Sequence, residues 1–190
     1  MAEVQGYAFL ALKILAGLLN DQAYKKLAKQ LKDNFLEKFW LENEKFFALA
    51  LDGQDLKRQA ITSNPGHLLF CGILEKKLAD LVVKKLFSRD LWTDYGIRTL
   101  SVNDLDFDET GYHLGSVWPH DNWIIAQGLK NGGYLTQYEK IKRAILTAFE
   151  KLNSIPELFG VNKKGELLKI NKACIIQAWS SAAALNFIKD

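Results

Sequence analysis

The stretch VQGYAFLALKILAGLL (residues 4–19), followed by AYKKLAKQLKDNFLEKF (residues 23–39), decides the fold. Apolar residues cover nearly every face of the first segment, which is typical of a helix that is buried on all sides. In the second segment they recur with a period of 3.6 residues, and lysines lie between them. Asn20 and Asp21 form a capping pair between the two segments. The sequence therefore predicts a buried helix followed by an outer helix.

The same alternation continues to the end of the chain. Further buried helices are expected at residues 65–74, 119–130 and 175–188, and further one-faced helices at residues 76–87 and 135–152. Pro65 and Pro119 occupy the first positions of two of them, where proline is favoured. Short extended stretches at residues 45–51 and around the turn at residues 162–165 predict small β-hairpins in the loops. Seven helices of alternating character indicate an all-α domain of helix pairs, arranged in a ring or a solenoid.

The composition excludes several classes of protein. The chain has 190 residues, of which 48% are hydrophobic and 25% charged, as in a soluble globular domain, and nothing marks a boundary within residues 1–190. Its 25 basic and 22 acidic residues are interspersed, so we expect no nucleic-acid partner. An apolar run of about 18 residues and a basic targeting segment are both missing, so we expect no membrane partner and a cytoplasmic location. Cys71 and Cys174 have apolar neighbours, and we expect two buried, reduced thiols.

Histidine and tryptophan residues concentrate in the later part of the chain. All three histidines and four of the five tryptophans lie between residues 67 and 179. Rings that stack on apolar faces and donate a hydrogen bond at one edge suit a sugar pocket, although such residues also fill ordinary cores. The chain has no HExxH or CxxC spacing, and the acidic residues 104–109 lack the glycine and the glutamate of a calcium loop. We therefore expect neither a metal nor another cofactor.

Glu157 differs from most other acidic residues in its neighbours. Ile155, Pro156, Leu158 and Phe159 flank it, whereas most other acids lie among lysines or in polar loops. An apolar environment disfavours the charged form of a carboxyl group, as a proton acceptor or donor that works near neutral pH requires. A structural role at a helix end or in a turn is the alternative that these residues leave open.

Six segments, spread over essentially the whole chain, resemble one known family. They are EVQGY (residues 3–7), SNPGHLLFCGIL (63–74), YGIRTLS (95–101), YHLGSVWPHDNWIIAQGL (112–129), PELFG (156–160) and QAWSSAA (177–183). In this order they are similar to the C-terminal part of the amylo-α-1,6-glucosidase, or glycogen debranching, family of inverting glycoside hydrolases. The resemblance implies an (α/α)6 toroid whose sugar site lies in a funnel of inner-helix ends and loops. Residues 1–190 would then form a partial toroid, the C-terminal half of a catalytic module.

The resemblance also implies a mechanism with two carboxyl groups. Glu157, in the PELFG segment, would be the general base, and an acid roughly 6.5 to 9.5 Å away would protonate the glycosidic oxygen. The implied substrate-binding residues are Gln5, Tyr7, Arg98, Trp118, His120, Asp121 and Trp179. Each of them has a structural alternative; for example, Arg98 would also serve to hold the loop at residues 101–116, and Asp121 to cap its helix.

The sequence departs from the family pattern in three places. Leu114 stands where family members carry Asn, and Ile175 and Ile176 stand where they carry Ser-Pro, so a polar contact of the sugar site is expected to be missing. The family's general acid, an Asp, lies just before the EVQGY segment and outside the residues given. We therefore expect a fragment that is nearly inactive alone and that associates with itself or with an upstream partner chain.

The substrate implied by the family is an α-glucan or an oligosaccharide, hydrolysed with inversion at an α-1,6-linked branch glucose. The alternative is a non-catalytic helical module that binds a glucan or a partner chain. The two hypotheses differ in what is expected before residue 1, because an upstream segment that bears the general-acid Asp would belong to an enzyme.

Overall fold

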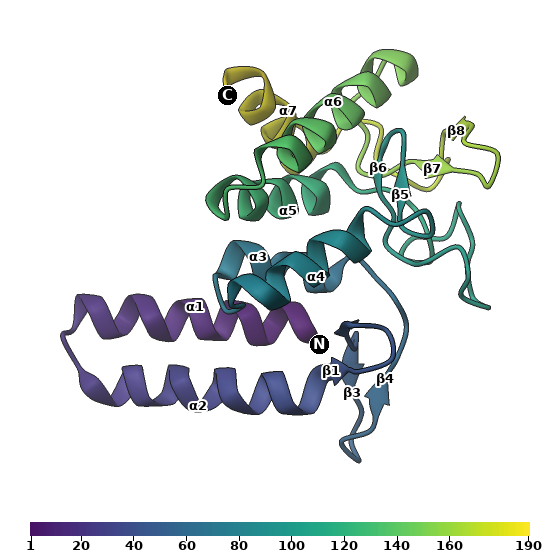
Figure 1. Ribbon diagram of the computed structural model, residues 1–190. Helices are drawn as coiled ribbons and strands as arrows, with labels where there is room; N and C mark the ends of the chain where they lie inside the picture. The colour runs from purple at the N-terminus through teal and green to yellow at the C-terminus, as the bar shows by residue number, and fades with distance from the viewer.

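The computed structural model describes all 190 residues and contains seven α-helices (Figure 1). They are α1 (Ala2–Leu18), α2 (Gln22–Phe39), α3 (His67–Cys71), α4 (Lys76–Leu86), α5 (Pro119–Asn131), α6 (Leu135–Leu152) and α7 (Ala178–Lys189). A short 3-10 helix, Asn64–Gly66, leads directly into α3. None of the helices combines the length and the apolar character that crossing a lipid bilayer requires. The predicted all-α architecture with seven helices is confirmed.

The odd-numbered helices form one continuous layer. Along this layer α1 packs on α3, α3 on α5, and α5 on α7. The even-numbered helix α2 packs on α1, and α6 packs on both α5 and α7. In Figure 1 the pair α1 and α2 lies at one end of the molecule and the group of α5, α6 and α7 at the other. The segments predicted as buried helices are thus neighbours in one layer, as expected.

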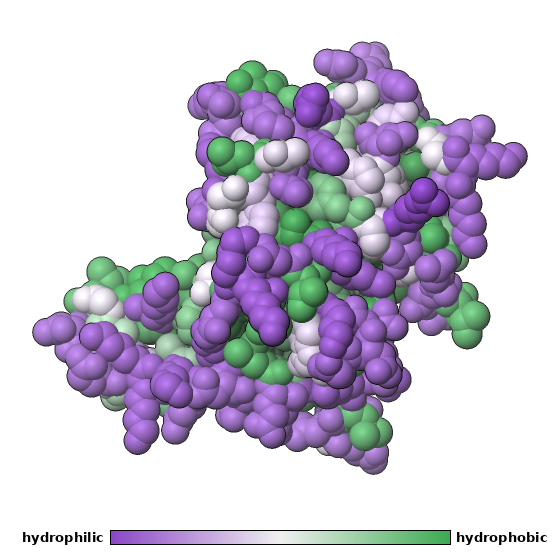
Figure 2. All heavy atoms as spheres, viewed as in Figure 1, coloured by the Kyte–Doolittle hydropathy of each residue, from purple (hydrophilic) through white to green (hydrophobic).

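The first helix is not buried on all sides, so this part of the prediction is wrong. Of the residues of α1, only Ala2, Gly6 and Ala16 are buried, whereas the exposed fraction reaches 53% for Val4 and 76% for Leu18. The physical reason is the place of α1 at the end of the layer, where α2 and α3 cover only part of its surface. Figure 2 shows the resulting hydrophobic surface along α1, above the hydrophilic surface of α2.

The second helix has the predicted single buried face. Asp21 caps it, because the Asp21 carboxylate accepts a hydrogen bond from the Ala23 backbone nitrogen at 2.7 Å. Phe35 and Phe39 are buried, and the rings of Phe35 and Phe47 stack with centroids 5.0 Å apart. Burial of each phenylalanine contributes about 1.5–3 kcal/mol. These contacts hold α2 to the segment that follows it.

Four antiparallel hairpins of two short strands occupy the loops. β1 (Trp40–Leu41) pairs with β2 (Phe46–Phe47), β3 (Ala50–Leu51) with β4 (Lys57–Arg58), β5 (Trp92–Thr93) with β6 (Gly96–Ile97), and β7 (Gly160–Val161) with β8 (Leu167–Leu168). The hairpins expected at residues 45–51 and around residues 162–165 are confirmed. The hairpin of β5 and β6 was not expected, because strands of two residues leave no periodic pattern.

Isolated β-bridges join the loops that lead into the inner helices. Val117, just before α5, pairs with both Arg98 and Phe159, and Thr62 pairs with Leu100. The segment before α3, the segment before α5 and the segment that carries Glu157 are therefore tied together at one end of the helix layer.

The last helix begins later than predicted. It starts at Ala178, and Ile175 and Ile176 lie in the irregular segment before it with exposed fractions of 75% and 77%. Cys174 lies in the same segment and is exposed, so the prediction of a buried thiol is wrong for this residue. Cys71 is buried in α3 as expected, and both thiols are free.

Candidate active site

A cavity of about 410 Å³ opens where the N-terminal ends of α1, α3 and α5 meet. Glu3 contributes from the start of α1, His67 from the start of α3, and Trp118 and Asp121 from the start of α5. Thr62 adds a hydroxyl group from the loop before the 3-10 helix. The cavity thus gathers side chains that lie far apart in the sequence, because successive inner helices begin at the same end of the layer.

A line of hydrogen bonds runs beside the cavity and joins three inner helices. The Tyr7 hydroxyl lies 2.6 Å from His67 Nδ1, and His67 Nε2 lies 2.6 Å from Asp121 Oδ1. Since a carboxylate only accepts hydrogen bonds, we assign the ring proton to Nε2, and Nδ1 then accepts from the Tyr7 hydroxyl. Burial raises the pKa of Tyr7 to about 12, so this hydroxyl keeps its proton at neutral pH. His67 thereby fixes the orientation of Asp121.

Three buried polar atoms around the cavity have no hydrogen-bond partner. They are Glu3 Oε2, Thr62 Oγ1 and Asp121 Oδ2. Thr62 has an exposed fraction of only 4%. Leaving such a group unsatisfied costs about 1–3 kcal/mol. Two carboxylates and one hydroxyl complement the hydroxyl groups of a sugar ring, since sugar hydroxyls donate to carboxylates.

Stacked aromatic rings form one wall of the site. The ring of His113 stacks on Trp118 with centroids 5.1 Å apart, and His120 stacks on Trp179 at 5.3 Å. The two tryptophan rings lie 6.5 Å apart. Burial lowers the pKa of His120, which keeps its ring neutral at pH 7. A wall of imidazole and indole rings suits the apolar face of a sugar.

Glu157 lies next to this wall and is 5% exposed. Its Oε1 accepts a hydrogen bond from the Tyr112 hydroxyl at 2.5 Å, and its Oε2 accepts one from the Cys174 backbone nitrogen at 3.3 Å. The ring of Tyr112 packs edge-on against Trp118, which lines the cavity, with centroids 4.7 Å apart. The carboxylate is therefore buried, held at both oxygens, and one ring away from the cavity wall.

Arg98 does not line the cavity but braces the loops beside it. Its guanidinium donates hydrogen bonds to the backbone oxygens of Val161 and Asn162, the latter at 3.2 Å. The guanidinium carbon also lies 5.4 Å from the centroid of the Phe107 ring, within the loop at residues 101–116. Arg98 therefore links that loop to the hairpin of β7 and β8, the structural alternative that its position in the sequence left open.

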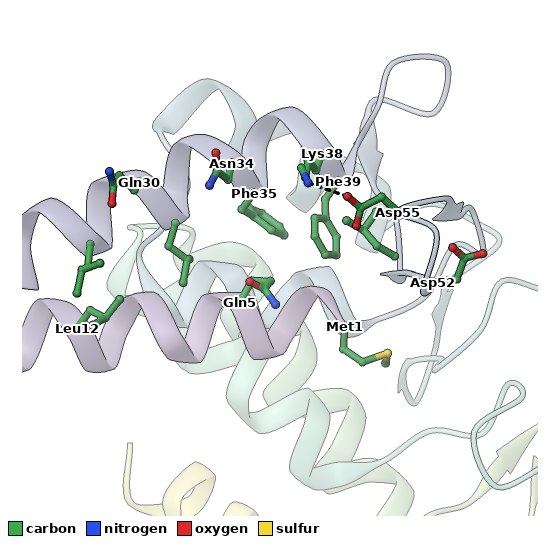
Figure 3. Close-up of a pocket in the computed structure, with 13 residues that line it drawn as sticks. Met1, Gln5, Leu12, Gln30, Asn34, Phe35, Lys38, Phe39, Asp52 and Asp55 are labelled. Atoms are coloured by element: carbon green, nitrogen blue, oxygen red, sulfur yellow. Dashed lines mark hydrogen bonds and ion pairs between the residues drawn. The ribbon is translucent and has the colours of Figure 1, made fainter.

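Gln5 lies in another cavity, of about 590 Å³, between α1 and α2 (Figure 3). Its neighbours there include Leu12 on the same helix and Asn34 on α2. The structure therefore separates Gln5 and Arg98 from the other residues implied by the resemblance. It brings together Tyr7, Trp118, His120, Asp121, Glu157 and Trp179.

Sequence reasoning missed several side chains of the site. Tyr112 and His113 lie in the quoted segment YHLGSVWP, and His67 lies in SNPGH. Each of them therefore lies inside a segment that carries the family resemblance. Glu3 opens the quoted segment EVQGY but was not singled out, and Thr62 lies outside the quoted segments, because a single acid or threonine at a helix start or in a loop is common.

Comparison with known proteins identifies the family. The model of the mannosylglycerate hydrolase MGH1-like glycoside hydrolase domain matches residues 2–161. The chain belongs to this family. Mannosylglycerate hydrolase MGH1 of Selaginella moellendorffii is 33% identical to it over 96 residues, which make up 49% of this chain and 19% of that protein. The predicted membership in a glycoside hydrolase family is confirmed, whereas the family is the MGH1-like one and not specifically that of the amylo-α-1,6-glucosidases.

Solved structures share the fold of this MGH1-like chain. The GH63 mannosylglycerate hydrolase of Thermus thermophilus, in complex with glucose, gives a TM-score of 0.79 at 19% identity, over 100% of this chain and 47% of that one. Neutral trehalase Nth1 of Saccharomyces cerevisiae gives 0.74 at 16% identity, over 98% of this chain and 36% of that one. The MGH1-like chain thus spans about half the length of the Thermus enzyme. The similarity to these glycoside hydrolases is consistent with part of an all-α toroid.

Proposed function

We propose that this chain forms the C-terminal half of the catalytic module of an inverting α-glycoside hydrolase, with Glu157 as the general base. The observation that carries the proposal is the buried Glu157 carboxylate, held by Tyr112 and by the Cys174 backbone beside a cavity with unpartnered acceptors. Membership in a glycoside hydrolase family supports the same conclusion.

In an inverting hydrolysis the base takes a proton from water while the water oxygen attacks the anomeric carbon. A carboxylic acid on the other side of the sugar protonates the leaving oxygen, so that one bond forms and one breaks. Glu157 suits the first role, because it is buried and two hydrogen bonds already orient its carboxylate. Asp121 suits sugar binding instead, since His67 holds one of its oxygens and the other lacks a partner at the cavity. In this proposal the general acid belongs to the other half of the toroid.

Two substrates are proposed for this site. The sequence resemblance favours an α-1,6-linked glucose at the branch of a glucan. The family model and the curated relative are named for mannosylglycerate hydrolysis, which favours instead a small glycoside of mannose and glycerate. The carboxylates Glu3 and Asp121 complement the hydroxyl groups that both substrates share, so the choice between them belongs to the experiment.

The other half of the toroid has two surfaces on which to dock. At one end of the helix layer α1 exposes Val4, Ile14 and Leu18, and at the other end α7 exposes Leu185 and Ile188. Monomers rarely leave contiguous apolar patches larger than a few hundred Å² uncovered. We propose that an N-terminal half-toroid covers both faces, and a second copy of this chain is the alternative occupant.

The experiment is reconstitution of the full toroid. The chain is fused to, or mixed with, an N-terminal half-toroid that bears the general-acid Asp. An α-1,6-branched oligosaccharide and mannosylglycerate are then tested separately as substrates. We expect hydrolysis with inversion. NMR spectroscopy, which identifies the first anomer released, is the measurement. The chain alone should be slower by at least the factor of about 10² to 10⁴ that proton transfer by a general acid contributes.

The base is tested by Glu157→Gln in the reconstituted protein. The amide keeps the shape of the side chain and loses its basicity, so turnover should be abolished while ligand binding by calorimetry stays within about twofold. Asp121→Asn is the matched control, because it should lower the affinity for the ligand more than it lowers the turnover rate of bound substrate. Full turnover by Glu157→Gln would remove Glu157 from this role. Binding without turnover by every reconstituted form would favour a non-catalytic module.

A further inference from the structure

We infer that Tyr112 is the positioning residue of the proposed base: its hydroxyl donates to Glu157 Oε1 and holds the carboxylate in the orientation that the reaction needs. The inference deepens the proposed function and rests on it. Tyr112 lies near the end of the loop at residues 101–116, and it contacts one oxygen of Glu157 while the Cys174 backbone nitrogen contacts the other.

The hydrogen bonds of Glu157 leave lone pairs to which the attacking water could donate. A carboxylate has about four lone-pair sites, two on each oxygen. Tyr112 occupies one site on Oε1, and the Cys174 nitrogen occupies one on Oε2. Each oxygen of Glu157 therefore keeps a free site. The two donors fix the side-chain rotation of Glu157 without occupying every lone pair of its carboxylate.

Tyr112 is itself held by the wall of the cavity. Its ring packs edge-on against Trp118 at an angle of 87°, and its backbone oxygen accepts hydrogen bonds from Trp118 Nε1 at 2.9 Å and from Ser116 Oγ at 2.8 Å. A sugar that stacks on Trp118 would thus rest on the residue that holds Tyr112. Ligand contact and orientation of Glu157 are connected through this one tyrosine.

The hydrogen bond has a measurable counterpart on the tyrosine. The bond to Glu157 raises the pKa of Tyr112 to about 12, with burial adding to the effect, so the hydroxyl stays a donor throughout the neutral range. The other titratable groups beside Tyr112 are the Cys174 thiol, which acts in the same direction, and the His113 ring at 4.8 Å. Titration of Tyr112 therefore reports mainly on its contact with Glu157.

The first test uses the chain as it is. Phenolate absorbance is followed against pH, and subtraction of the Tyr112→Phe curve isolates Tyr112. We expect Tyr112 to titrate near 12 in the parent chain and closer to 10 in Glu157→Gln, because a neutral amide no longer disfavours the phenolate. Asp80→Asn is the matched control, since Asp80 accepts from a different tyrosine, Tyr134. The ring-carbon chemical shift of Tyr112 at neutral pH gives the same comparison without alkali.

The second test uses the reconstituted enzyme and Tyr112→Phe, which keeps the ring packed on Trp118 and removes only the donor. We expect kcat to fall by about 10- to 100-fold, as for a misplaced catalytic group, and KM to change by less than about twofold. A raised KM with unchanged kcat would make Tyr112 a binding residue and overturn the inference. Equal titration of Tyr112 in the parent chain and in Glu157→Gln would also overturn it, whereas full activity of Glu157→Gln would instead remove the proposed base.

Discussion

Replacement of Asn122 by alanine should destabilise the contact between β6 and the start of α5, which supports the site. Asn122 is fully buried in the first turn of α5, where its Oδ1 accepts from the Ile97 nitrogen at 2.7 Å and its Nδ2 donates to the backbone oxygens of Ile97 and Trp118, both at 3.0 Å. These bonds join β6 to the start of α5. Arg98 directly follows Ile97, and Trp118 lies one helical turn before Asn122. The bonds of Asn122 therefore fix the positions of Arg98 and Trp118 relative to each other.

The magnitude follows from the groups that lose a partner. The Trp118 oxygen keeps the helical hydrogen bond from the Asn122 nitrogen, at 3.0 Å, so the loss falls on the N–H and C=O of Ile97. Ile97 has no exposed surface, so water does not replace the side chain. At about 1–3 kcal/mol for each buried group left unsatisfied, Asn122→Ala should lower the free energy of unfolding by about 2–6 kcal/mol.

The assay is urea unfolding followed by circular dichroism, with Asn186→Ala as the matched control. Asn186 is exposed on α7, where its amide bonds to the Ala182 oxygen of the preceding turn, so its loss should change stability by no more than about 0.5 kcal/mol. A loss below about 1 kcal/mol for Asn122→Ala, with an unchanged dependence on urea, would refute the reasoning that this amide joins β6 to α5.

Three further predictions concern packing, pH and association. Gly128→Ala should lower the melting temperature by several degrees, because a Cβ on α5 would overlap the Phe70 backbone nitrogen of α3, whereas Gly17→Ala, which meets nothing within 4 Å, should leave it unchanged or raise it. Burial lowers the pKa of His120, so the stability it contributes is present above about pH 6.5 and is lost as the pH falls; denaturant unfolding at pH 7 and pH 5 should show a smaller difference in His120→Gln than in the parent chain. The chain alone should self-associate in light scattering, and Leu18→Lys on the exposed face of α1 should reduce this, so a clean monomer of the parent chain would count against the docking faces.

The helices were predictable where a repeating pattern extends over several turns. The helix α6 has the bounds expected from its sequence, because its apolar residues keep the 3.6-residue period over 18 residues. The exposed face of α1 was not predictable, since an apolar pattern indicates that a face needs cover without indicating what covers it. The late start of α7 has a similar cause, because Ile175 and Ile176 continue the apolar character of the helix into a segment that is irregular.

The site was predictable by segment and only partly by side chain. Gln5 and Tyr7 come from the same quoted segment, but two residues of a helix differ by about 200° in direction. Tyr7 therefore reaches His67 in the cavity, whereas Gln5 faces α2. Tyr112 shows the other limit, because its partner Glu157 lies 45 residues away and nothing local announces the contact.

The exposed apolar face of α1 also bears on how much of this protein a cell would retain. A helix that shows Val4, Ile14 and Leu18 to water presents the kind of surface by which quality-control chaperones and proteases recognise incomplete proteins. Covering α1 would remove this surface, so a copy with a covered α1 would be recognised less than an uncovered one. If an N-terminal half-toroid covers α1, as proposed above, the abundance of the chain would follow the supply of that half.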